Sequence, residues 1–268
     1  MLSACALTAP SSSAAREELS QGPRTVIGPQ TARDQAGVSI LVYHRFGGAV
    51  SDAMTVRTTT FRWQLDYLKD HHHPVVPLRT LISWLLGQSP PPPPGAVAIT
   101  VDDGHLSVFT EMWPVVHEYN VPVTLFVYPS AISNASYAMT WQQLAALHRT
   151  GLFDVQSHTY WHPNFRIEKR RLSSAAYQVF ASTQLVKAKT VLEGKLGGNV
   201  DLIAWPFGIY DDELIALARE AGYSAGVTLD RRMVTPREST MALPRFLVTD
   251  SRQGFASMVE RRTTTPGY

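Results

Sequence analysis

The segment between Gly95 and Phe109, GAVAITVDDGHLSVF, is the most informative stretch of this 268-residue chain. Residues 96–101 are apolar or β-branched throughout, which is typical of a strand buried on both faces. Two adjacent carboxylates, Asp102 and Asp103, follow directly. Because neighbouring like charges raise each other's pKa and are costly to desolvate, we expect another group to neutralise them at this end of the strand.

Strand and helix patterns alternate around this segment. Strand patterns cover residues 38–44, 96–101, 121–129, 153–158, 201–208, 223–229 and 242–248. Helical patterns cover 58–70, 79–87, 106–119, 140–151, 173–198 and 211–222, and the helix at 140–151 opens on a capping box, Thr140 with Gln143. Such alternation implies a mainly parallel sheet. About seven strands in about 225 residues predict a (β/α) barrel, with a doubly wound open sheet as the alternative.

The composition is that of an ordinary soluble globular protein, with 44% hydrophobic and 17% charged residues and a formal charge of +2. The length suits one large domain or two small ones. The sequence contains no basic stripe and no run of like charges, so nothing points to a nucleic-acid partner. No apolar run reaches the roughly 18–20 residues that a membrane-spanning helix needs.

The amino-terminal region predicts a tether. Residues 1–36 are rich in Ser, Ala, Pro and Gln, residues 37–262 form the expected folded domain, and 263–268 form a short tail. Cys5 is the single cysteine, so no internal disulfide can form. Cys5 is the last residue of the segment LSAC, residues 2–5, which has the form of a bacterial lipobox. In a lipobox this cysteine would carry a lipid anchor. The charged and most of the apolar residues that should precede a lipobox are missing, so either the true start lies upstream or the match is chance.

Ionisable residues gather where the predicted strands end. His44 ends the first strand, Asp102 and Asp103 follow the second, and His158 ends the strand at 153–158, with His162 shortly after it. The carboxyl ends of barrel strands meet at one rim. Two histidines and one carboxylate can form a facial divalent-metal site with open positions for water and substrate. The metal would neutralise one aspartate of the pair, and the other would be free to act as a base.

Each of these motifs is weak when taken alone. A His-x3-His pair is more often structural, and Asp-Asp-Gly is more often a turn or a cap. Their joint presence on two strand ends is much more specific.

Together the two motifs resemble those of the NodB-homology polysaccharide deacetylases, the fourth carbohydrate esterase family. The first motif stands here as Thr100-Val101-Asp102-Asp103-Gly104, and the second as His158-Thr159-Tyr160-Trp161-His162-Pro163. The resemblance covers roughly residues 38–259 and implies a distorted (β/α) barrel.

The resemblance also implies an activity and a set of roles. Asp102 would be the general base, and Asp103, His158 and His162 would hold a divalent metal ion. The implied reaction is hydrolysis of N-acetyl groups on a sugar polymer, in which a protonated acid donates to the leaving amine. Zinc is the first expectation for the ion, with cobalt and nickel as alternatives, because this donor set accepts several divalent ions.

The sequence departs from the family in two places. The usual third motif, Arg-x-Pro-Tyr, is replaced by Ala204-Trp205-Pro206-Phe207-Gly208, and the usual late Leu-x-His is missing. With VYHRF early and LPRF late, the chain looks more like the bacterial poly-N-acetylglucosamine deacetylases. We therefore expect His44 to be the acid, unless it only hydrogen-bonds backbone, and Arg245 to be the partner of Asp102.

The substrate expected from this resemblance is an acetylated polysaccharide, specifically a β-linked N-acetylglucosamine exopolysaccharide of the biofilm type. Tyr160, Trp161, Pro206 and Phe207 are the candidate substrate-binding residues. Alternative substrates are peptidoglycan, chitin oligomers or O-acetyl esters. A sugar-binding barrel that has lost turnover is an alternative of another class. The protein is expected to be exported, as a periplasmic protein or an outer-membrane lipoprotein, and its oligomeric state is left open.

Overall fold

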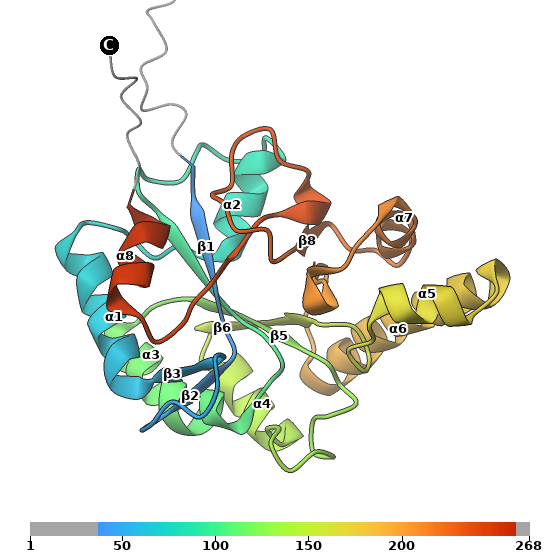
Figure 1. The fold of residues 1–268 in the computed structure, drawn as a ribbon, viewed down its shortest axis with the longest axis horizontal. Helices are drawn as coiled ribbons and strands as arrows, with labels where there is room; N and C mark the ends of the chain where they lie inside the picture. Colours follow the sequence, from blue (N-terminus) through green and yellow to red (C-terminus); the bar gives the residue numbers. More distant parts are fainter. Residues whose placement is uncertain (1–36, 261–268) are drawn as a thin grey trace, which may run out of the picture. The chain divides into compact units, whose positions relative to one another are not determined.

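The computed structural model describes residues 37–260, in which seven parallel strands form one sheet (Figure 1). The strands are β1 (Ser39–Tyr43), β4 (Val97–Val101), β5 (Val123–Val127), β6 (Phe153–Ser157), β7 (Leu202–Ala204), β8 (Ala225–Val227) and β9 (Phe246–Leu247). Their order is β8-β7-β6-β5-β4-β1-β9. Cys5, the expected tether and the expected tail lie outside the described residues.

The strand β9 is one edge of this sheet, and the segment leading into it contacts the opposite edge. Phe246 of β9 pairs with Leu41 of β1, and Leu243 forms a parallel bridge with Val227 of β8. The amide of Thr228 also donates to the carbonyl of Leu243 at 2.8 Å. The sheet is therefore curled into a distorted barrel, and the prediction of a barrel rather than an open sheet is confirmed.

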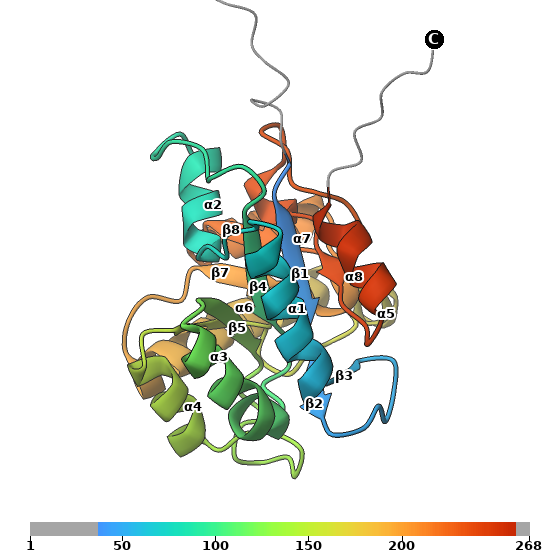
Figure 2. The same cartoon turned by 90° about the vertical axis from the view of Figure 1, so that its left-hand side faces the viewer.

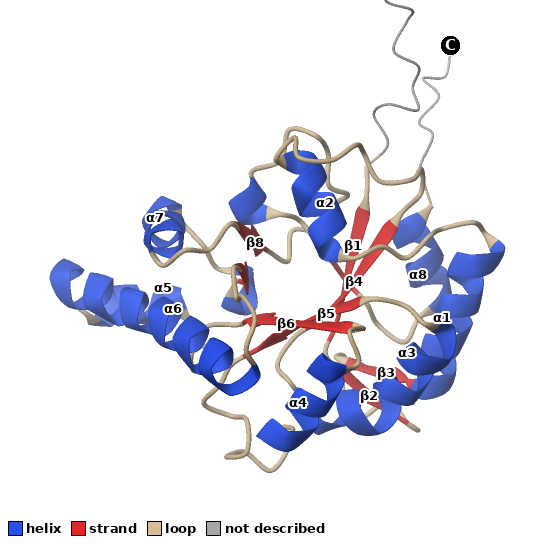
Figure 3. Ribbon diagram, turned by 180° about the vertical axis from the view of Figure 1, so that it is seen from behind, coloured by secondary structure: helices blue, strands red, loops and turns tan. Residues whose placement is uncertain are grey.

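Helices cover the outside of the sheet (Figures 2 and 3). They are α1 (Thr58–Asp70), α2 (Leu78–Leu85), α3 (Trp113–Tyr119), α4 (Trp141–Arg149), α5 (Phe165–Arg171), α6 (Ser174–Leu196), α7 (Asp212–Glu220) and α8 (Arg252–Val259). The α6 helix packs against β6, α4, α5 and α7. The capping box of Thr140 and Gln143 begins α4, as predicted. None of the described helices is long and apolar enough to cross a membrane.

Several segments differ from the sequence prediction, and α8 had no predicted counterpart. The helix expected over 106–119 is a π-helical segment, η2 (Val108–Met112), followed by α3, because Pro114 in the first turn of α3 cannot donate a backbone hydrogen bond to the preceding turn. The strand expected over 201–208 ends at Ala204, and a short helical turn, η3 (Pro206–Gly208), follows it. The α5 helix was not expected, because it is short and buries only Phe165, which leaves no apolar periodicity to detect.

Three other short elements complete the described chain. The strands β2 (Arg45–Gly47) and β3 (Thr55–Arg57) pair with each other just after β1, and η4 (Thr240–Ala242) precedes β9.

The main strands are buried on both faces, so neighbouring residues enter different apolar clusters. Leu41 and Ile99 lie in the larger cluster, whereas Ile40 and Ala98 lie in the cluster that packs against α2.

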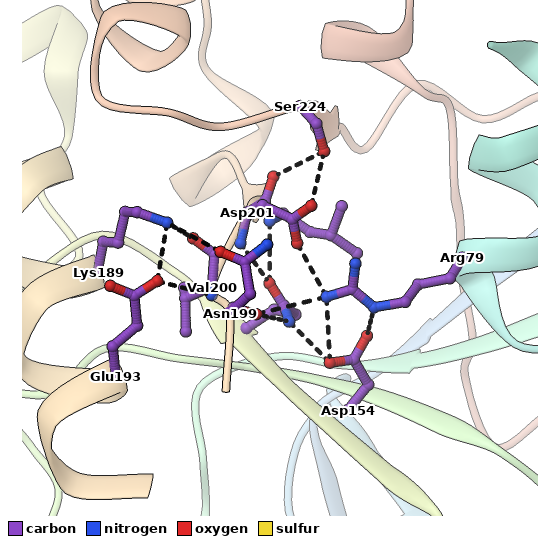
Figure 4. A network of polar contacts seen from close by, with 10 residues as sticks. Arg79, Asp154, Lys189, Glu193, Asn199, Val200, Asp201 and Ser224 are labelled. Atoms are coloured by element: carbon purple, nitrogen blue, oxygen red, sulfur yellow. Dashed lines mark hydrogen bonds and ion pairs between the residues drawn. The ribbon is translucent and has the colours of Figure 1, made fainter. Parts of the chain in front are cut away.

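A polar network ties together the amino ends of β6, β7 and β8 (Figure 4). Arg79 of α2 donates to Asp154 at 2.7 Å and to Asp201 at 2.8 Å. The buried side chain of Gln156 donates to Asp154 and accepts from the backbone amides of Asp201 and Leu202. In (β/α) barrels this end of the strands serves stability, and the opposite, carboxyl end carries the chemistry.

Candidate active site

A cleft of about 320 Å³ opens at the carboxyl ends of the barrel strands. Each of β1, β4, β5, β6 and β7 contributes to it through the residues that follow the strand. The cleft is lined by His44, Arg45, Met54, Asp102, Asp103, Tyr128, His158, His162, Trp205, Phe207 and Leu229. The structure thus brings the two motifs of the sequence analysis to one place.

Asp103, His158 and His162 form a group that fits a divalent metal ion. One ligand atom from each of the three lies within 4.8 Å of the others. Oδ1 of Asp103 is 3.7 Å from Nε2 of His158 and 3.9 Å from Nε2 of His162. Ligand atoms bound to one zinc ion are about 3.0–3.4 Å apart, so the two distances from Asp103 exceed those of a zinc-bound site by a few tenths of an ångström.

The backbone fixes the orientation of His158. Its Nδ1–H donates to the carbonyl of Ala204 in β7 at 2.7 Å, which leaves Nε2 facing the cleft as an acceptor. This is the usual arrangement of a metal-binding histidine, in which one ring nitrogen is held by a carbonyl or carboxylate. Burial lowers the pKa of His158 to about 3, so the ring is neutral and its Nε2 lone pair is free to bind a cation.

Oδ2 of Asp102 is also 3.9 Å from Nε2 of His158, but Arg245 holds Asp102 in a bidentate ion pair. The two terminal nitrogens of Arg245 donate to the two oxygens of Asp102 at 2.8 and 2.7 Å. Arg245 is completely buried, and it also donates to the carbonyl of Thr228 and the hydroxyl of Thr100. Four of the five N–H groups of the guanidinium therefore have an acceptor.

Burial and neighbouring charges shift the pKa values of the two aspartates in opposite directions. Burial by itself would raise the pKa of Asp102, but the charge of Arg245 outweighs it and lowers the pKa to about 2. Burial raises the pKa of Asp103, and the charge of Asp102 adds to this. Asp102 is thus an ionised carboxylate at neutral pH. Asp103 is the carboxyl group of the pair whose ionised form a bound cation would stabilise more.

His44 lies in the same cleft, directly after β1. The ring is almost fully buried, and its Nδ1 has no hydrogen-bond partner among the described residues. A buried polar atom without a partner is costly and is commonly satisfied by a bound molecule. The alternative given above for His44, a histidine that only hydrogen-bonds the backbone, therefore gains no support from Nδ1.

Backbone strain is concentrated at this cleft. Seven residues other than glycine have a positive φ within the described part of the chain, and four of them belong to the two motifs or to η3. These four are Asp103 at +76°, Thr159 at +64°, His162 at +63° and Phe207 at +57°. Such conformations cost on the order of 1–3 kcal/mol each and persist only where the surroundings enforce them.

The candidate substrate-binding residues separate into two groups. Phe207 lines the cleft, and 55% of its surface is exposed. Pro206 is buried beside it but is not part of the lining. Tyr160 lies under the ammonium group of Lys187, and Trp161 packs against Phe180, so neither of them lines the cleft.

Sequence reasoning missed four residues that line the cleft: Arg45, Met54, Tyr128 and Leu229. Tyr128 follows β5, and Leu229 ends the strand predicted over 223–229, so the strand-end rule applied to His44 could have found both. Arg45 follows His44 directly. Met54 comes from the loop before β3, and no pattern in the sequence marks it.

Curated relatives match this chain in sequence, and solved structures share its fold. The poly-β-1,6-N-acetyl-D-glucosamine N-deacetylase of Staphylococcus epidermidis is 26% identical over 211 residues, which cover 77% of this chain and 71% of the relative. The enzyme of the same name from Staphylococcus aureus is 22% identical over the same shares of the two chains.

Among solved structures, IcaB from Ammonifex degensii superimposes with a TM-score of 0.74 at 25% identity, over 84% of this chain and 98% of that one. The Streptococcus pyogenes deacetylase PplD, in complex with acetate, has the same TM-score at 21% identity, over 85% of this chain and 100% of that one. A sequence profile described as polysaccharide deacetylase matches residues 89–226, more than half of the chain. This chain therefore belongs to the polysaccharide deacetylase family.

Proposed function

We propose that this enzyme removes N-acetyl groups from a β-1,6-linked poly-N-acetylglucosamine polysaccharide. The observation that carries the proposal is the convergence in one cleft of a buried, ionised aspartate and a three-residue metal site. Hydrolysis of an unactivated amide needs a base for water and a group that stabilises the developing oxyanion. The polymer is suggested by the relatives whose names specify it.

Asp103, His158 and His162 would hold the divalent ion, for which zinc is the first candidate and cobalt or nickel are alternatives. When bound, such an ion polarises the substrate carbonyl and lowers the pKa of water. The protein's own residues would then move the protons. Asp102 would accept the proton of the attacking water, since Arg245 keeps it ionised and fixes the direction of both its oxygens.

His44 would supply the proton that the leaving amine requires. It approaches the cleft from β1, whereas the metal-binding histidines come from beyond β6. Its unpartnered Nδ1 is suited to a hydrogen bond that forms only when substrate is present.

The apolar side chains of the cleft would surround the acetyl methyl group. Met54, Trp205, Phe207 and Leu229 line the cleft together with the polar residues. Trp205 is rigid, because it is fully buried and its indole N–H donates to the carbonyl of Met241 at 2.8 Å. This part of the cleft would favour an acetyl group over a charged substituent.

For the rest of the chain, residues 37–262 would be the catalytic domain, with 1–36 as a tether and 263–268 as a tail. The lipobox form of residues 2–5 supports export with a lipid anchor at Cys5. Labelling with a radioactive or alkyne-tagged fatty acid in a bacterial host, compared between wild type and Cys5→Ala, tests this anchor directly.

The deciding experiment measures acetate release from poly-β-1,6-N-acetylglucosamine oligomers, first after chelation and then after adding zinc, cobalt or nickel. We expect release to disappear with the chelator and to return with metal. Chitin oligomers, peptidoglycan and an O-acetylated xylan serve as comparison substrates. Faster release from one of these would replace the proposed substrate, and no release from any of them by a metal-loaded protein would favour a sugar-binding barrel.

Variants then separate the roles of the two aspartates. Asp103→Ala and His158→Ala are expected to lose metal and activity together, whereas Asp102→Asn is expected to keep the metal and lose turnover. If Asp102→Asn lost the metal and Asp103→Ala retained it, the assignment within the pair would be reversed.

A further inference from the structure

The two histidines of the candidate metal site are held in different ways. The His158 ring is almost fully buried, and its Nδ1–H donates to the carbonyl of Ala204. The His162 side chain is 21% exposed. Within residues 37–260 neither of its ring nitrogens hydrogen-bonds to another residue, and only its backbone amide does, to the hydroxyl of Thr159. The ring hydrogen-bonds its own backbone, but none of the other described residues supplies the polar support that normally orients a metal-binding histidine.

Aromatic rings take the place of that support. The ring of Phe207 meets the His162 imidazole edge to face, with centroids 4.5 Å apart and planes at 66°. Tyr128 contacts the same imidazole, with centroids 5.3 Å apart and planes at 46°. The His158 ring contacts it as well, at 4.6 Å and 71°. The imidazole of His162 is thus in contact with three rings, of which one follows β5, one follows β6 and one lies in η3.

The rings beside His162 are themselves held in place. The hydroxyl of Tyr128 hydrogen-bonds to that of Tyr137 at 2.6 Å, so Tyr128 cannot rotate freely away from the cleft. The backbone of Phe207 adopts a left-handed conformation between Pro206 and Gly208, which sets the direction in which its side chain leaves the η3 turn. His162 also has a positive φ and would relax from it if the surrounding contacts were removed.

We propose that Tyr128 and Phe207 are positioning residues that hold the His162 imidazole with Nε2 facing Asp103. Packing against aromatic edges restricts the ring in the way that a hydrogen bond restricts His158. The inference rests on the metal site of the proposed function, and it concerns metal affinity rather than contact with substrate. Partners that orient metal ligands typically change metal affinity about 10- to 100-fold when they are removed.

The test measures metal binding without substrate. Zinc affinity is measured by competition with a chromophoric chelator, and the visible absorption of the cobalt form reports the coordination geometry. We expect Phe207→Leu and Tyr128→Leu each to weaken zinc binding about tenfold and to alter the cobalt spectrum. Tyr128→Phe keeps the ring and loses only the hydrogen bond to Tyr137. Unlike Tyr128→Leu, it should therefore retain a zinc affinity within about threefold of wild type.

A matched control uses Tyr67, whose ring stacks on His71 outside the cleft at a centroid distance of 3.8 Å. Tyr67→Leu also removes a tyrosine–histidine ring contact, which is stacked at 18° rather than tilted, and should leave zinc affinity and the cobalt spectrum unchanged. Phe207 is 55% exposed, so Phe207→Leu removes little buried surface and should fold. This variant therefore tests the positioning role even if Tyr128→Leu does not fold.

Zinc affinity of folded Phe207→Leu within twofold of wild type, with the cobalt spectrum unchanged, would overturn the proposed positioning role. An equal loss of zinc affinity in Tyr67→Leu would also overturn it, because the loss would then not depend on a ring contact with His162. If wild-type protein bound no zinc or cobalt, both this inference and the proposed function would fail. Wild-type binding with unchanged variants would overturn the inference alone.

Discussion

Replacing Arg245 with methionine tests the arrangement on which the proposed base depends. The substitution keeps a long side chain in the barrel but removes both charge-assisted hydrogen bonds to Asp102, at 2.8 and 2.7 Å. It also removes the donor to the carbonyl of Thr228. Asp102 would remain buried without the cation that keeps it ionised, because burial alone raises the pKa of a carboxyl group.

The cost follows from the burial of the pair. Removing one partner of a fully buried ion pair typically destabilises a protein by about 3–5 kcal/mol, since the other charge is left without compensation. For a domain of this size, that loss corresponds to a fall of roughly 6–20 °C in Tm. We also expect turnover to fall at least about 100-fold, because a protonated Asp102 cannot accept a proton from water.

Urea unfolding in the presence of a chelator measures the effect, since a bound metal would add its own stabilisation. Arg79→Met is the matched control. Arg79 also contacts two carboxylates, Asp154 and Asp201, but its side chain is 41% exposed, so its loss should cost about 1 kcal/mol or less.

A double-mutant cycle gives the decisive comparison. Arg245→Met combined with Asp102→Asn should cost less than the sum of the single variants by about 1–3 kcal/mol, because the second change removes the uncompensated charge. Additive costs, or a loss below 1 kcal/mol in Arg245→Met, would refute the view that this pair is energetically coupled.

Three further predictions address the acid, the network at the amino end of the barrel and a helix cap. His44→Ala should lower turnover about 100-fold at unchanged zinc affinity, measured by acetate release and chelator competition, and wild-type turnover would leave the acid unassigned. Gln156→Leu should destabilise the protein by about 2–5 kcal/mol in urea unfolding without changing zinc affinity, because two backbone amides lose their acceptor, and a neutral effect would contradict this. Asp211 caps α7 and accepts a hydrogen bond from Lys169, so Asp211→Ala should cost about 1 kcal/mol at pH 7. Burial alone would raise the pKa of Asp211, but these hydrogen bonds lower it below its usual 3.8, so its contribution should shrink as the pH falls below 3.8, and a difference independent of pH would exclude this role.

The strands of the barrel could be predicted because their signal is local. A strand buried on both faces must be apolar along its length, so β1, β4 and β5 can be recognised without knowing what covers them. The polar residues of the two motifs were predictable for a related reason. The carboxyl ends of parallel strands must share one rim, so residues that follow them are brought together whatever the loops do.

The sequence by itself therefore determined that this chain forms a barrel and that Asp102, Asp103, His158 and His162 lie at one end of it. Only the tertiary structure decided how side chains next to each other in sequence are used. Phe207 lines the cleft while Pro206 does not, and His162 lies in it while Trp161 packs against Phe180. The physical reason is the backbone: positive φ angles at His162 and Phe207 turn neighbouring side chains in directions that no periodicity predicts, and contacts distant in sequence hold these strained conformations in place.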